Sequence, residues 1–597
     1  MRIEPDGNAI VAADFVDIDM GADRVLLVRA RDGVTRSVER MEAEFLKALR
    51  RPCPPEAIPS KLRAMGWEAI DRSWIGDLID SLGGEGWVGS LESFVRSATE
   101  ASAKLGPDKE ASTLSALTWP TRDRPELLGR GLSAWRQAFE SSGLAFPDAV
   151  IADDSTREEE VTRSVVERFA GEWGGETFYL ERSFRNRLVG ELSKLDEEIA
   201  RFALDPEAPR NQGVLRYGAN RNLIALACGG RKIAMSDDDV LPEFRTKAEG
   251  GAGIELMLGG DPAMISAFAS EAGIGALDSV SFASAFAAHG ATLGKRSIAL
   301  LSEAGSANYA WIDSSSLDKV LDPSTRIGAL CFGIWGDSGM ANSRYLLVAR
   351  ERLDPESLEG ADYESLANSR ILFRAPRRPS FGGGFFQGVH VSFDLGQLLP
   401  PFAPLGRCED NLWAASLSRL RPDLIIANPR EAARHAPKGR TTARGEVLDF
   451  KVRCNEVIAA ILPRAEQAGE AAATFRTVGS ALAAIATAAI PQFRRWMSER
   501  YGQHLSLLVG RMEALMGEYG GASKAWDEDM ESAIDDLRER SLRSFSWLPE
   551  EFADDEEGFR IYLRRFGLLL QGWPELVEKA TFLGPGLLEE ARTLAKP

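Results

Sequence analysis

The chain has 597 residues, of which 44% are hydrophobic and 27% are charged. This length predicts several domains, and the composition excludes a disordered or fibrous protein. The net charge of -18 argues against broad binding to nucleic acid, which requires a basic surface facing the phosphates, so we expect no nucleic-acid partner.

The cysteines and the apolar segments predict a cytoplasmic protein. The 5 cysteines are scattered and form no Cys-x-x-Cys pair, which is typical of reduced, structural thiols. The first residues, MRIEPDGNAI, lack the basic and apolar stretches of a secretory signal. The most apolar segment, 481–490, is about half the length of roughly 20 residues that spans a bilayer. We therefore expect no transmembrane segment.

Residues 1–105 have the pattern of a small α+β domain. Short strands are predicted at 15–19 and 24–29, with the hairpin signal Asp32-Gly33 after them. Helical patterns and a terminal wing follow, at 39–49, 57–65, 73–82 and 83–88. This order resembles the PqqD-like domain, a winged-helix element that holds leader peptides, and the resemblance implies peptide binding by strand addition. A generic winged helix or an accessory cap is the alternative.

The next part of the chain predicts an α/β core. A small, polar segment at 101–112 is typical of a linker. After it, apolar runs alternate with helical patterns, at 114–117, 127–139, 149–152, 162–170, 176–180 and 186–203. Such alternation predicts a mainly parallel sheet with ligands at the carboxyl ends of its strands.

The segment 217–240, YGANRNLIALACGGRKIAMSDDDV, combines a short helix with an apolar strand that ends in three aspartates. Adjacent carboxylates resist burial together, so a cation is their natural partner. Alternation along a strand would place Asp237 and Asp239 on one side, where they could share a divalent ion. A solvated acidic turn is an equally good interpretation of the three aspartates alone.

Three motifs in chain order resemble glycosyltransferase family 2 and its relatives of GT-A fold. They are 121–125 (TRDRP), 149–156 (AVIADDST), and 218–222 (GANRN) with the following Asp-x-Asp at 237–239. The resemblance extends over roughly 112–440. It implies that Asp237 and Asp239 hold Mn2+ or Mg2+ on a UDP-sugar or GDP-sugar. The implied contacts to that nucleotide sugar are Thr121, Arg124, Asp153 at the base or ribose, Asp154, Arg221 at the diphosphate, Asn222 and Asp238.

Two later features extend the resemblance. Glu409-Asp410 opens a helical pattern after the glycine loop 381–385, and the resemblance implies that Asp410, or alternatively Glu409, is the base that deprotonates the acceptor hydroxyl. A helix cap is the simpler interpretation, because carboxylates favour a helix N-terminus. His435 would be a further ligand of the same metal by resemblance, although a lone loop histidine more often lies at the surface.

The remaining patterns are less specific. Residues 261–286 are alanine-rich and predict a helix, and 328–339 favour a tight turn over a loop that faces a ligand. From about 444 onward the sequence is helical throughout, with segments at 447–462, 466–489, 493–519, 524–541, 559–570 and 573–596. An all-α domain that packs on the core or forms a homodimer is the simplest interpretation.

Together these features predict an α/β protein with a winged-helix-like domain at 1–105, a GT-A core at 112–443 and a helical domain at 444–597. The resemblance implies a metal-dependent, inverting glycosyltransferase whose acceptor is a peptide, a protein or a glycan. The alternatives are an enzyme that glycosylates cell-surface glycans, a nucleotidyltransferase, and a non-catalytic scaffold with a degenerate GT-A core.

Overall fold

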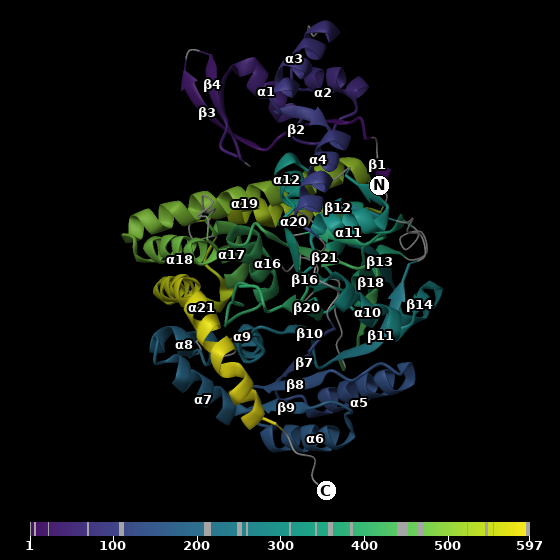
Figure 1. The fold of residues 1–597 in the computed structure, drawn as a ribbon, viewed down its shortest axis with the longest axis vertical. Coiled ribbons are helices and arrows are strands. Elements are labelled where there is room, and N and C mark those ends of the chain that lie inside the picture. The colour runs from purple at the N-terminus through teal and green to yellow at the C-terminus, as the bar shows by residue number, and fades with distance from the viewer. Residues whose placement is uncertain are drawn as a thin grey trace.

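The computed structural model is a mixed α/β protein in which a large sheet runs through the centre of the molecule (Figure 1). It describes residues 2–4, 7–21, 23–30, 32–67, 71–106, 113–207, 216–247, 253–257, 261–309, 312–340, 343–355, 362–382, 386–438, 450, 452–463, 470–521, 523–543, 547–552 and 555–592. Half of the predicted linker (107–112) and part of the predicted glycine loop (383–385) lie outside these residues, and residues 101–104 of that linker belong to a helix.

The central sheet has 11 strands. Their order is β1 (Arg2–Glu4), β15 (Ser306–Asn308), β12 (Ile254–Met257), β19 (Ser380–Gly382), β21 (Leu424–Asn428), β16 (Arg326–Cys331), β20 (His390–Asp394), β10 (Lys232–Ser236), β7 (Ala116–Thr121), β8 (Asp148–Asp153) and β9 (Thr177–Leu180). Neighbours are parallel except β19 with β21, and β20 with both β16 and β10. The expectation of a mainly parallel sheet is therefore confirmed for the central sheet.

The direction in which the chain is wound reverses between β7 and β10. From β7 the chain passes through α5 (Pro125–Ser142) to β8, and through α6 (Glu159–Glu172) to β9 on the same side. After α7 (Arg182–Leu192), α8 (Glu197–Leu204) and α9 (Tyr217–Ala227) it returns to β10 on the other side of β7. Ligands of open α/β sheets bind at the carboxyl ends of strands beside such a reversal.

A second sheet of 6 strands lies beside the first. Its order is β13 (Met264–Phe268), β18 (Ile371–Ala375), β17 (Gly333–Asp337), β22 (Ala432–His435), β11 (Val240–Thr246) and β14 (Asp278–Val280). The helix expected over 261–286 is wrong for most of its length, because pairing of β13 with β18 overrides alanine propensity. The expected turn at 328–339 is also wrong in part, since β17 is a paired strand.

The remaining helices of the core are short. In the described ranges they are α10 (Phe282–Thr292), α11 (Ser297–Ala304), α12 (Ser314–Leu321), α13 (Tyr345–Val348), α15 (Tyr363–Ala367) and α16 (Glu409–Leu420), with 3-10 turns at Glu271–Ala276 and Arg350–Arg352. Of these, α16 matters most for the site, because the acidic pair Glu409-Asp410 forms its first turn.

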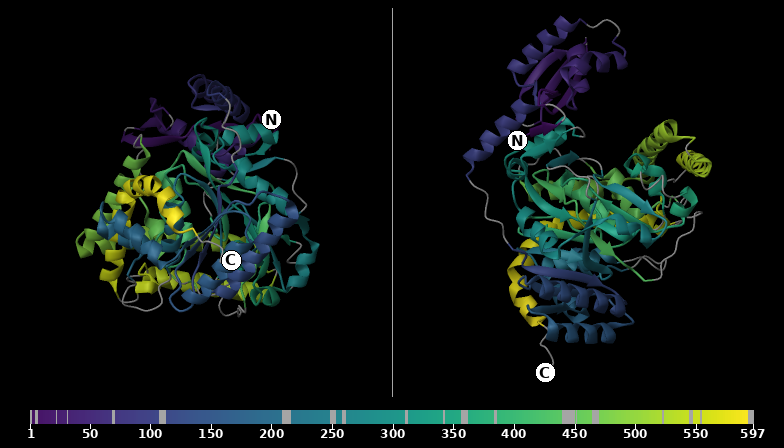
Figure 2. Two further views of the ribbon diagram at one scale, coloured as in Figure 1. Left: turned by 60° about the horizontal axis from the view of Figure 1, so that its bottom comes forward. Right: turned by 90° about the vertical axis from the view of Figure 1, so that its right-hand side faces the viewer.

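The N-terminal part projects from the core as a small body (Figure 2). Its elements are β2 (Ile10–Ala12), β3 (Phe15–Gly21), β4 (Arg24–Arg29), β5 (Thr35–Glu39), α1 (Arg40–Ala48), a 3-10 turn (Pro55–Ala57), α2 (Ile58–Ala64), α3 (Arg72–Gly84), β6 (Val88–Ser90) and α4 (Leu91–Lys104). Strands β3, β4 and β5 form an antiparallel sheet over a separate apolar core that includes Phe45 and Trp87. By contrast, β1 pairs with β15 and belongs to the central sheet.

The C-terminal part is helical, as expected, in its described residues. The helices are α17 (Cys454–Ile461), α18 (Ala471–Thr487), α19 (Ile490–Tyr519), α20 (Lys524–Leu542) and α21 (Glu556–Glu590), with a 3-10 turn at Glu550–Phe552. The two segments expected after 559 are one helix, which continues through Pro574 and Pro585 because it packs along α18, α8 and α9. No helix in the described ranges is long and apolar enough to cross a membrane.

Candidate functional site

The three aspartates form a tight turn between two strands. Strand β10 ends at Ser236 and β11 begins at Val240, whose amide N–H donates to the carbonyl of Asp237 over 3.2 Å. The aspartates therefore do not alternate along a strand, and the expectation that Asp237 and Asp239 face one side for that reason is wrong. The three carboxylates have different sets of partners, and Asp238 and Asp239 share Arg124.

Asp239 lies against His435, at the end of β22. Its Oδ1 is 3.2 Å from His435 Nε2, and both side chains are buried. His435 Nδ1 donates to the carbonyl of Asp337 over 2.8 Å, and the Asp337 carboxylate is paired with Arg370 at 2.7 Å. Burial lowers the pKa of His435, but the hydrogen bond to Asp239 and the negative charge of Asp239 outweigh burial and raise it. Protonated His435 donates from Nε2 to Asp239, whereas in neutral His435 the Nε2 atom carries a lone pair that faces Asp239.

The chemistry of this pair fits a divalent cation. Two ligands at right angles around an octahedral ion lie about 3 Å apart when each bond is about 2.1 Å, close to the 3.2 Å between His435 Nε2 and Asp239 Oδ1. Carboxylate oxygen suits Mn2+ and Mg2+, and imidazole nitrogen is a ligand of transition-metal ions. Within the described ranges, no group of three or more His, Cys, Asp or Glu is arranged to hold a metal ion. Further ligands would be water and substrate phosphate, as is usual for Mg2+.

Asp238 points toward the end of β7. Thr121 Oγ1 donates to Asp238 Oδ2 over 2.8 Å, and Arg124 Nη1 lies 3.4 Å from Asp238 Oδ1 and 3.5 Å from Asp239 Oδ2. Burial, reinforced by the charge of Asp239, raises the pKa of Asp238 to about 7. Thr121 and Asp238 are buried, whereas the Arg124 side chain is 36% exposed. Thr121 and Asp238 thus shape the turn, and Arg124 faces the solvent side.

Arg221 connects the aspartate turn to the acidic pair of α16. Its guanidinium lies 2.9 Å from Asp237 Oδ1, forms a second ion pair with Glu409, and donates to the Gly388 carbonyl over 3.0 Å. It also lies over the Phe402 ring. A Cβ atom at position 388 would be 3.0 Å from Arg221 Cζ, so glycine permits this approach. The guanidinium is engaged by protein groups, which differs from the expected contact with a diphosphate.

Glu409 and Asp410 occupy the first turn of α16 and differ in exposure. Glu409 is buried, and burial raises its pKa to about 7 against the opposing effect of Arg221. Asp410 is only half-buried. Its Oδ2 accepts from the Gly388 amide at 3.3 Å and its Oδ1 from the Asn411 amide at 2.8 Å. Asp410 is therefore the more accessible member of the pair and is held in a fixed orientation.

Asp153 and Asp154 lie at the end of β8. Asp153 accepts from the Ser155 amide at 2.8 Å and from the Tyr179 hydroxyl at 2.7 Å, and burial raises its pKa. Asp154 lies 3.4 Å from the guanidinium of Arg185. The two carboxylates therefore lie beside the carboxyl end of β7, which in turn pairs with β10, the strand that leads into the aspartate turn.

Two residues that the sequence did not assign hold these strand ends together. Asn220 donates to the carbonyls of Thr121 and Ala152 over 3.2 and 2.9 Å, which ties β7 to β8. Its own Oδ1 accepts from Arg185 at 3.0 Å. The signal for Asn220 was its place in the polar run Asn220-Arg221-Asn222 of the motif 218–222. Arg185 carried no local signal.

Asn222 does not face this site. It is fully buried, and its amide group bonds to the Phe402 amide at 2.8 Å, the Phe402 carbonyl at 2.9 Å and the Ala203 carbonyl at 3.2 Å. Gly218, one turn earlier, permits the same close packing, because a Cβ there would be 1.9 Å from the Ala403 carbonyl oxygen. The expected contact of Asn222 with a nucleotide sugar is wrong, and the residue fastens α9 to the 402–403 segment.

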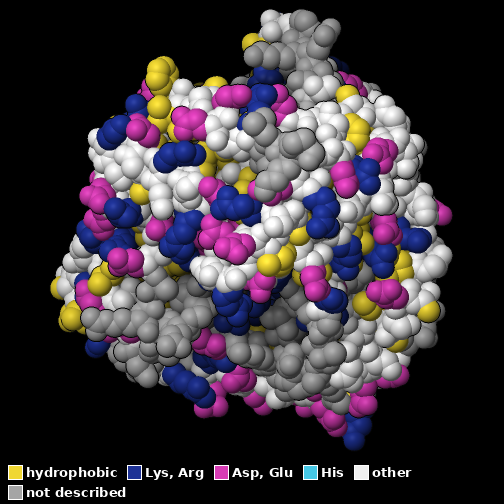
Figure 3. Space-filling model, turned by 90° about the horizontal axis from the view of Figure 1, so that it is seen from below, with side chains coloured by type: hydrophobic (Ala, Val, Ile, Leu, Met, Phe, Trp, Pro, Cys, Tyr) yellow, Lys and Arg dark blue, Asp and Glu magenta, His cyan; other side chains and the backbone are white. Residues whose placement is uncertain are grey.

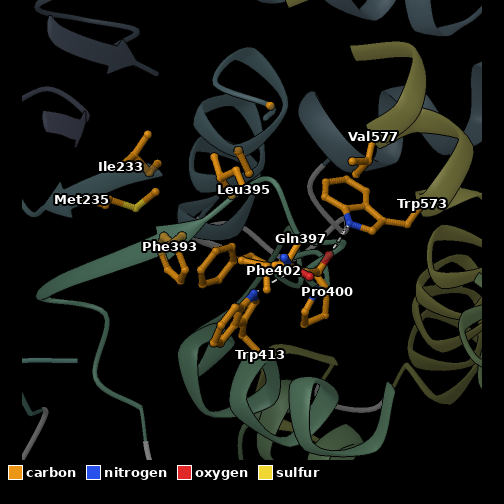
Figure 4. Close-up of a pocket in the computed structure, with 13 residues that line it drawn as sticks. Ile233, Met235, Phe393, Leu395, Gln397, Pro400, Phe402, Trp413, Trp573 and Val577 are labelled. Carbon is orange, nitrogen blue, oxygen red and sulfur yellow. Dashed lines mark hydrogen bonds between the residues drawn. The ribbon is translucent and has the colours of Figure 1, made fainter. Parts of the chain in front are cut away.

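An apolar cavity lies between β10, β20, α16 and α21 (Figure 4). Its volume of about 20 Å³ is enough for one water molecule at most. The indoles of Trp413 and Trp573 line it and donate to the carbonyls of Pro400 and Leu399, both over 2.8 Å. The cavity belongs to the packed core and is too small for a substrate.

The surface and the comparisons with known proteins add no assignment. On the face seen in Figure 3, acidic and basic side chains are interspersed rather than separated into fields of one sign. No family model matches the chain, and no curated protein matches it.

Proposed function

We propose that the chain is a metal-dependent glycosyltransferase with a GT-A core, which transfers a sugar from a nucleoside-diphosphate sugar to an acceptor hydroxyl. One observation carries the proposal. The carboxyl ends of β8, β7 and β10 lie in adjacent strands and bear Asp153, Thr121 and the aspartate turn, and the turn is linked through Arg221 to the acidic N-terminus of α16. The proposed donor site is thus linked to the acidic pair that would include the proton acceptor.

The donor would lie across the reversal between β7 and β10. Asp153 and Asp154 supply acceptors for the hydroxyl or N–H groups of the ribose or base. Arg124, whose side chain is 36% exposed, is the better candidate for the diphosphate, because Arg221 is buried and its donors are engaged. Asp239 and His435 would hold Mn2+ or Mg2+. When bound, the ion supplies positive charge that stabilises the departing nucleoside diphosphate.

Asp410 would accept the proton of the attacking hydroxyl. The acceptor oxygen bonds to the anomeric carbon, the bond from that carbon to the diphosphate oxygen breaks, and the proton passes to the Asp410 carboxylate. Attack from the face opposite the leaving group inverts the anomeric centre. A proton acceptor positioned in this way contributes on the order of 10²- to 10⁴-fold. Arg221 would favour the ionised form of the neighbouring Glu409 and hold its side chain in place.

A peptide or protein acceptor is favoured by the N-terminal sheet. Among the described strands, β3 pairs only with β4, so its other edge is open. Val16, Ile18 and Met20 alternate along this edge strand and are 58%, 49% and 58% exposed. An open edge with an apolar face suits an extended peptide that adds as a further strand. Tethering one segment there would raise the local concentration of another at Asp410.

The proposed function is tested by screening nucleotide sugars with Mn2+ for a rise in melting temperature, followed by mass spectrometry with candidate acceptors. We expect one donor to stabilise the protein only with the metal and to be turned over. Formation of pyrophosphate and a nucleotide sugar would instead establish a nucleotidyltransferase. If a nucleotide sugar stabilises the protein but no nucleotide sugar is turned over, the non-catalytic scaffold is favoured.

A further inference from the structure

The C-terminal helices hold the loop that leads into the acidic pair Glu409-Asp410. Asn455, on α17, donates from Nδ2 to the carbonyls of Leu405 and Arg407, each over 2.9 Å. Tyr562, on α21, lies with its hydroxyl 2.9 Å from the Leu405 carbonyl and 3.1 Å from Asn455 Oδ1. Asn455 is 0% and Tyr562 is 3% exposed. Two buried side chains from another part of the chain thus bind the backbone of this loop.

The loop has an unfavourable conformation that needs such support. Cys408, the residue before α16, has a φ of 63°, in the left-handed region that side chains rarely adopt. In the described part of the chain no side chain caps this helix in the usual way. Gly406 has a φ of 84°, and a Cβ atom there would be 2.5 Å from Cys454 Sγ on α17. The loop is therefore shaped against the C-terminal helices.

The conformation of the loop sets the start of α16. The Leu412 amide donates to the Cys408 carbonyl over 3.1 Å in the first turn, so a shift at Cys408 moves Glu409 and Asp410 with it. On its other side the pair is held by Arg221 and by the Gly388 amide. Displacement of a reacting group by about 1 Å can cost on the order of 100-fold in rate.

We propose that Asn455 and Tyr562 are positioning residues, through which the C-terminal helices complete the transfer site by fixing the loop 405–408 and hence Asp410. The effect on transfer rests on the proposed function, whereas the ordering of the loop does not. The helical part would thereby have a role in the reaction, in addition to packing.

The test uses Tyr562→Phe and Asn455→Asp in the full chain. Tyr562→Phe removes only the hydroxyl, and Asn455→Asp keeps the side-chain shape but loses both donors. The matched control is Tyr345→Phe on α13, since the Tyr345 hydroxyl is buried and has no hydrogen-bond partner in the described structure. Hydrogen exchange of the amides at 405–412, kcat for transfer, and the Kd for the donor are measured for each variant.

We expect Tyr562→Phe to speed amide exchange at 405–412 and to lower kcat by about 10- to 100-fold, with the donor Kd within about twofold of wild type. Tyr345→Phe should change none of these. Unaltered exchange in Tyr562→Phe would overturn the proposal, and so would faster exchange with an unaltered kcat. A wild-type protein that transfers no sugar would refute the proposed function, while the exchange rates would still decide whether Tyr562 orders the loop. If Asn455→Asp does not fold, the exchange rates and kcat of Tyr562→Phe decide the proposal alone.

Discussion

His435 and Asp239 come from distant parts of the chain, yet His435 Nε2 lies 3.2 Å from Asp239 Oδ1 with both side chains buried. The contact follows from the pairing of β22 with β11, in which His435 is opposite Val240. The Ala436 amide also donates to the Asp239 carbonyl over 2.9 Å. The pair is therefore fixed by backbone structure on both sides.

Asp239→Asn and His435→Gln should each weaken Mn2+ binding on the order of 100-fold, because each removes a ligand atom while preserving the shape of the site. Binding is measured by the loss of the free Mn2+ signal in electron paramagnetic resonance. Asp278→Asn, at an exposed position of β14, is the control and should bind like wild type. Unchanged Mn2+ affinity in both site variants would rule out this metal site.

Arg221→Met should destabilise the protein by about 3–5 kcal/mol, since it leaves Asp237 and Glu409 without their shared cation. The double variant Arg221→Met/Glu409→Gln should lose less than the sum of the two single variants, because one of the unpaired charges is removed. Denaturant unfolding measures each free energy. Arg157→Met, at a side chain that is 81% exposed, should change stability by about 0.5 kcal/mol or less. If the effects of the two substitutions on the free energy of unfolding are strictly additive, Arg221 and Glu409 do not interact as an ion pair.

Val16→Ser/Ile18→Ser should raise the KM for a peptide acceptor about tenfold while leaving the donor Kd unchanged, because two apolar contacts of the open β3 edge are lost. The matched control is Leu507→Ser on α19, where the leucine is 76% exposed. Steady-state kinetics with the acceptor varied gives KM. If the two variants have the same KM, the β3 edge does not bind the acceptor.

Stability should fall in mild acid because two buried imidazoles are kept neutral. Burial lowers the pKa of His390 to about 3, and it lowers the pKa of His289 well below its usual value. The unfolded chain protonates both near pH 6.5, so below that pH it binds more protons than the folded state does. The free energy of unfolding then drops by about 1.4 kcal/mol per pH unit for each histidine, down to about pH 3 for His390.

His289→Phe should remove one of these two contributions. The difference in unfolding free energy between wild type and His289→Phe should therefore shrink by about 1.4 kcal/mol between pH 7.5 and pH 5.5. Ser392→Ala is the control: it removes the hydrogen-bond partner of His289 but keeps the imidazole, so its acid sensitivity should persist. A difference that does not vary with pH would show that the pKa of His289 is the same in the folded and unfolded states.

The sequence predicted those parts of the site that are local in the chain. The aspartates at the end of β10 and the acidic pair at the start of α16 were recognisable, because each follows an apolar or glycine-rich run. The contacts of His435 with Asp337, and of Asn455 with the loop 405–407, depend on strand and helix packing over long separations. A local pattern carries no information about them.

The same limit explains the wrong expectations. Asn222 lies within a motif, but the motif does not reveal that its amide faces the Phe402 backbone rather than the site. The alanine-rich segment 261–286 has helical propensity, yet pairing with β18 makes part of it a strand. Tertiary contacts decided both cases.

Product analysis of wild type and Asp410→Asn, each incubated with Mn2+, a nucleotide sugar and an acceptor, decides whether the chain transfers sugar. Wild type should release nucleoside diphosphate together with glycosylated acceptor. Asp410→Asn keeps the shape of the side chain but cannot accept the proton, so transfer should fall by about 100-fold or more while the donor Kd stays the same. Absence of glycosylated product from the wild type with every donor, or undiminished transfer by Asp410→Asn, would contradict the proposed reaction.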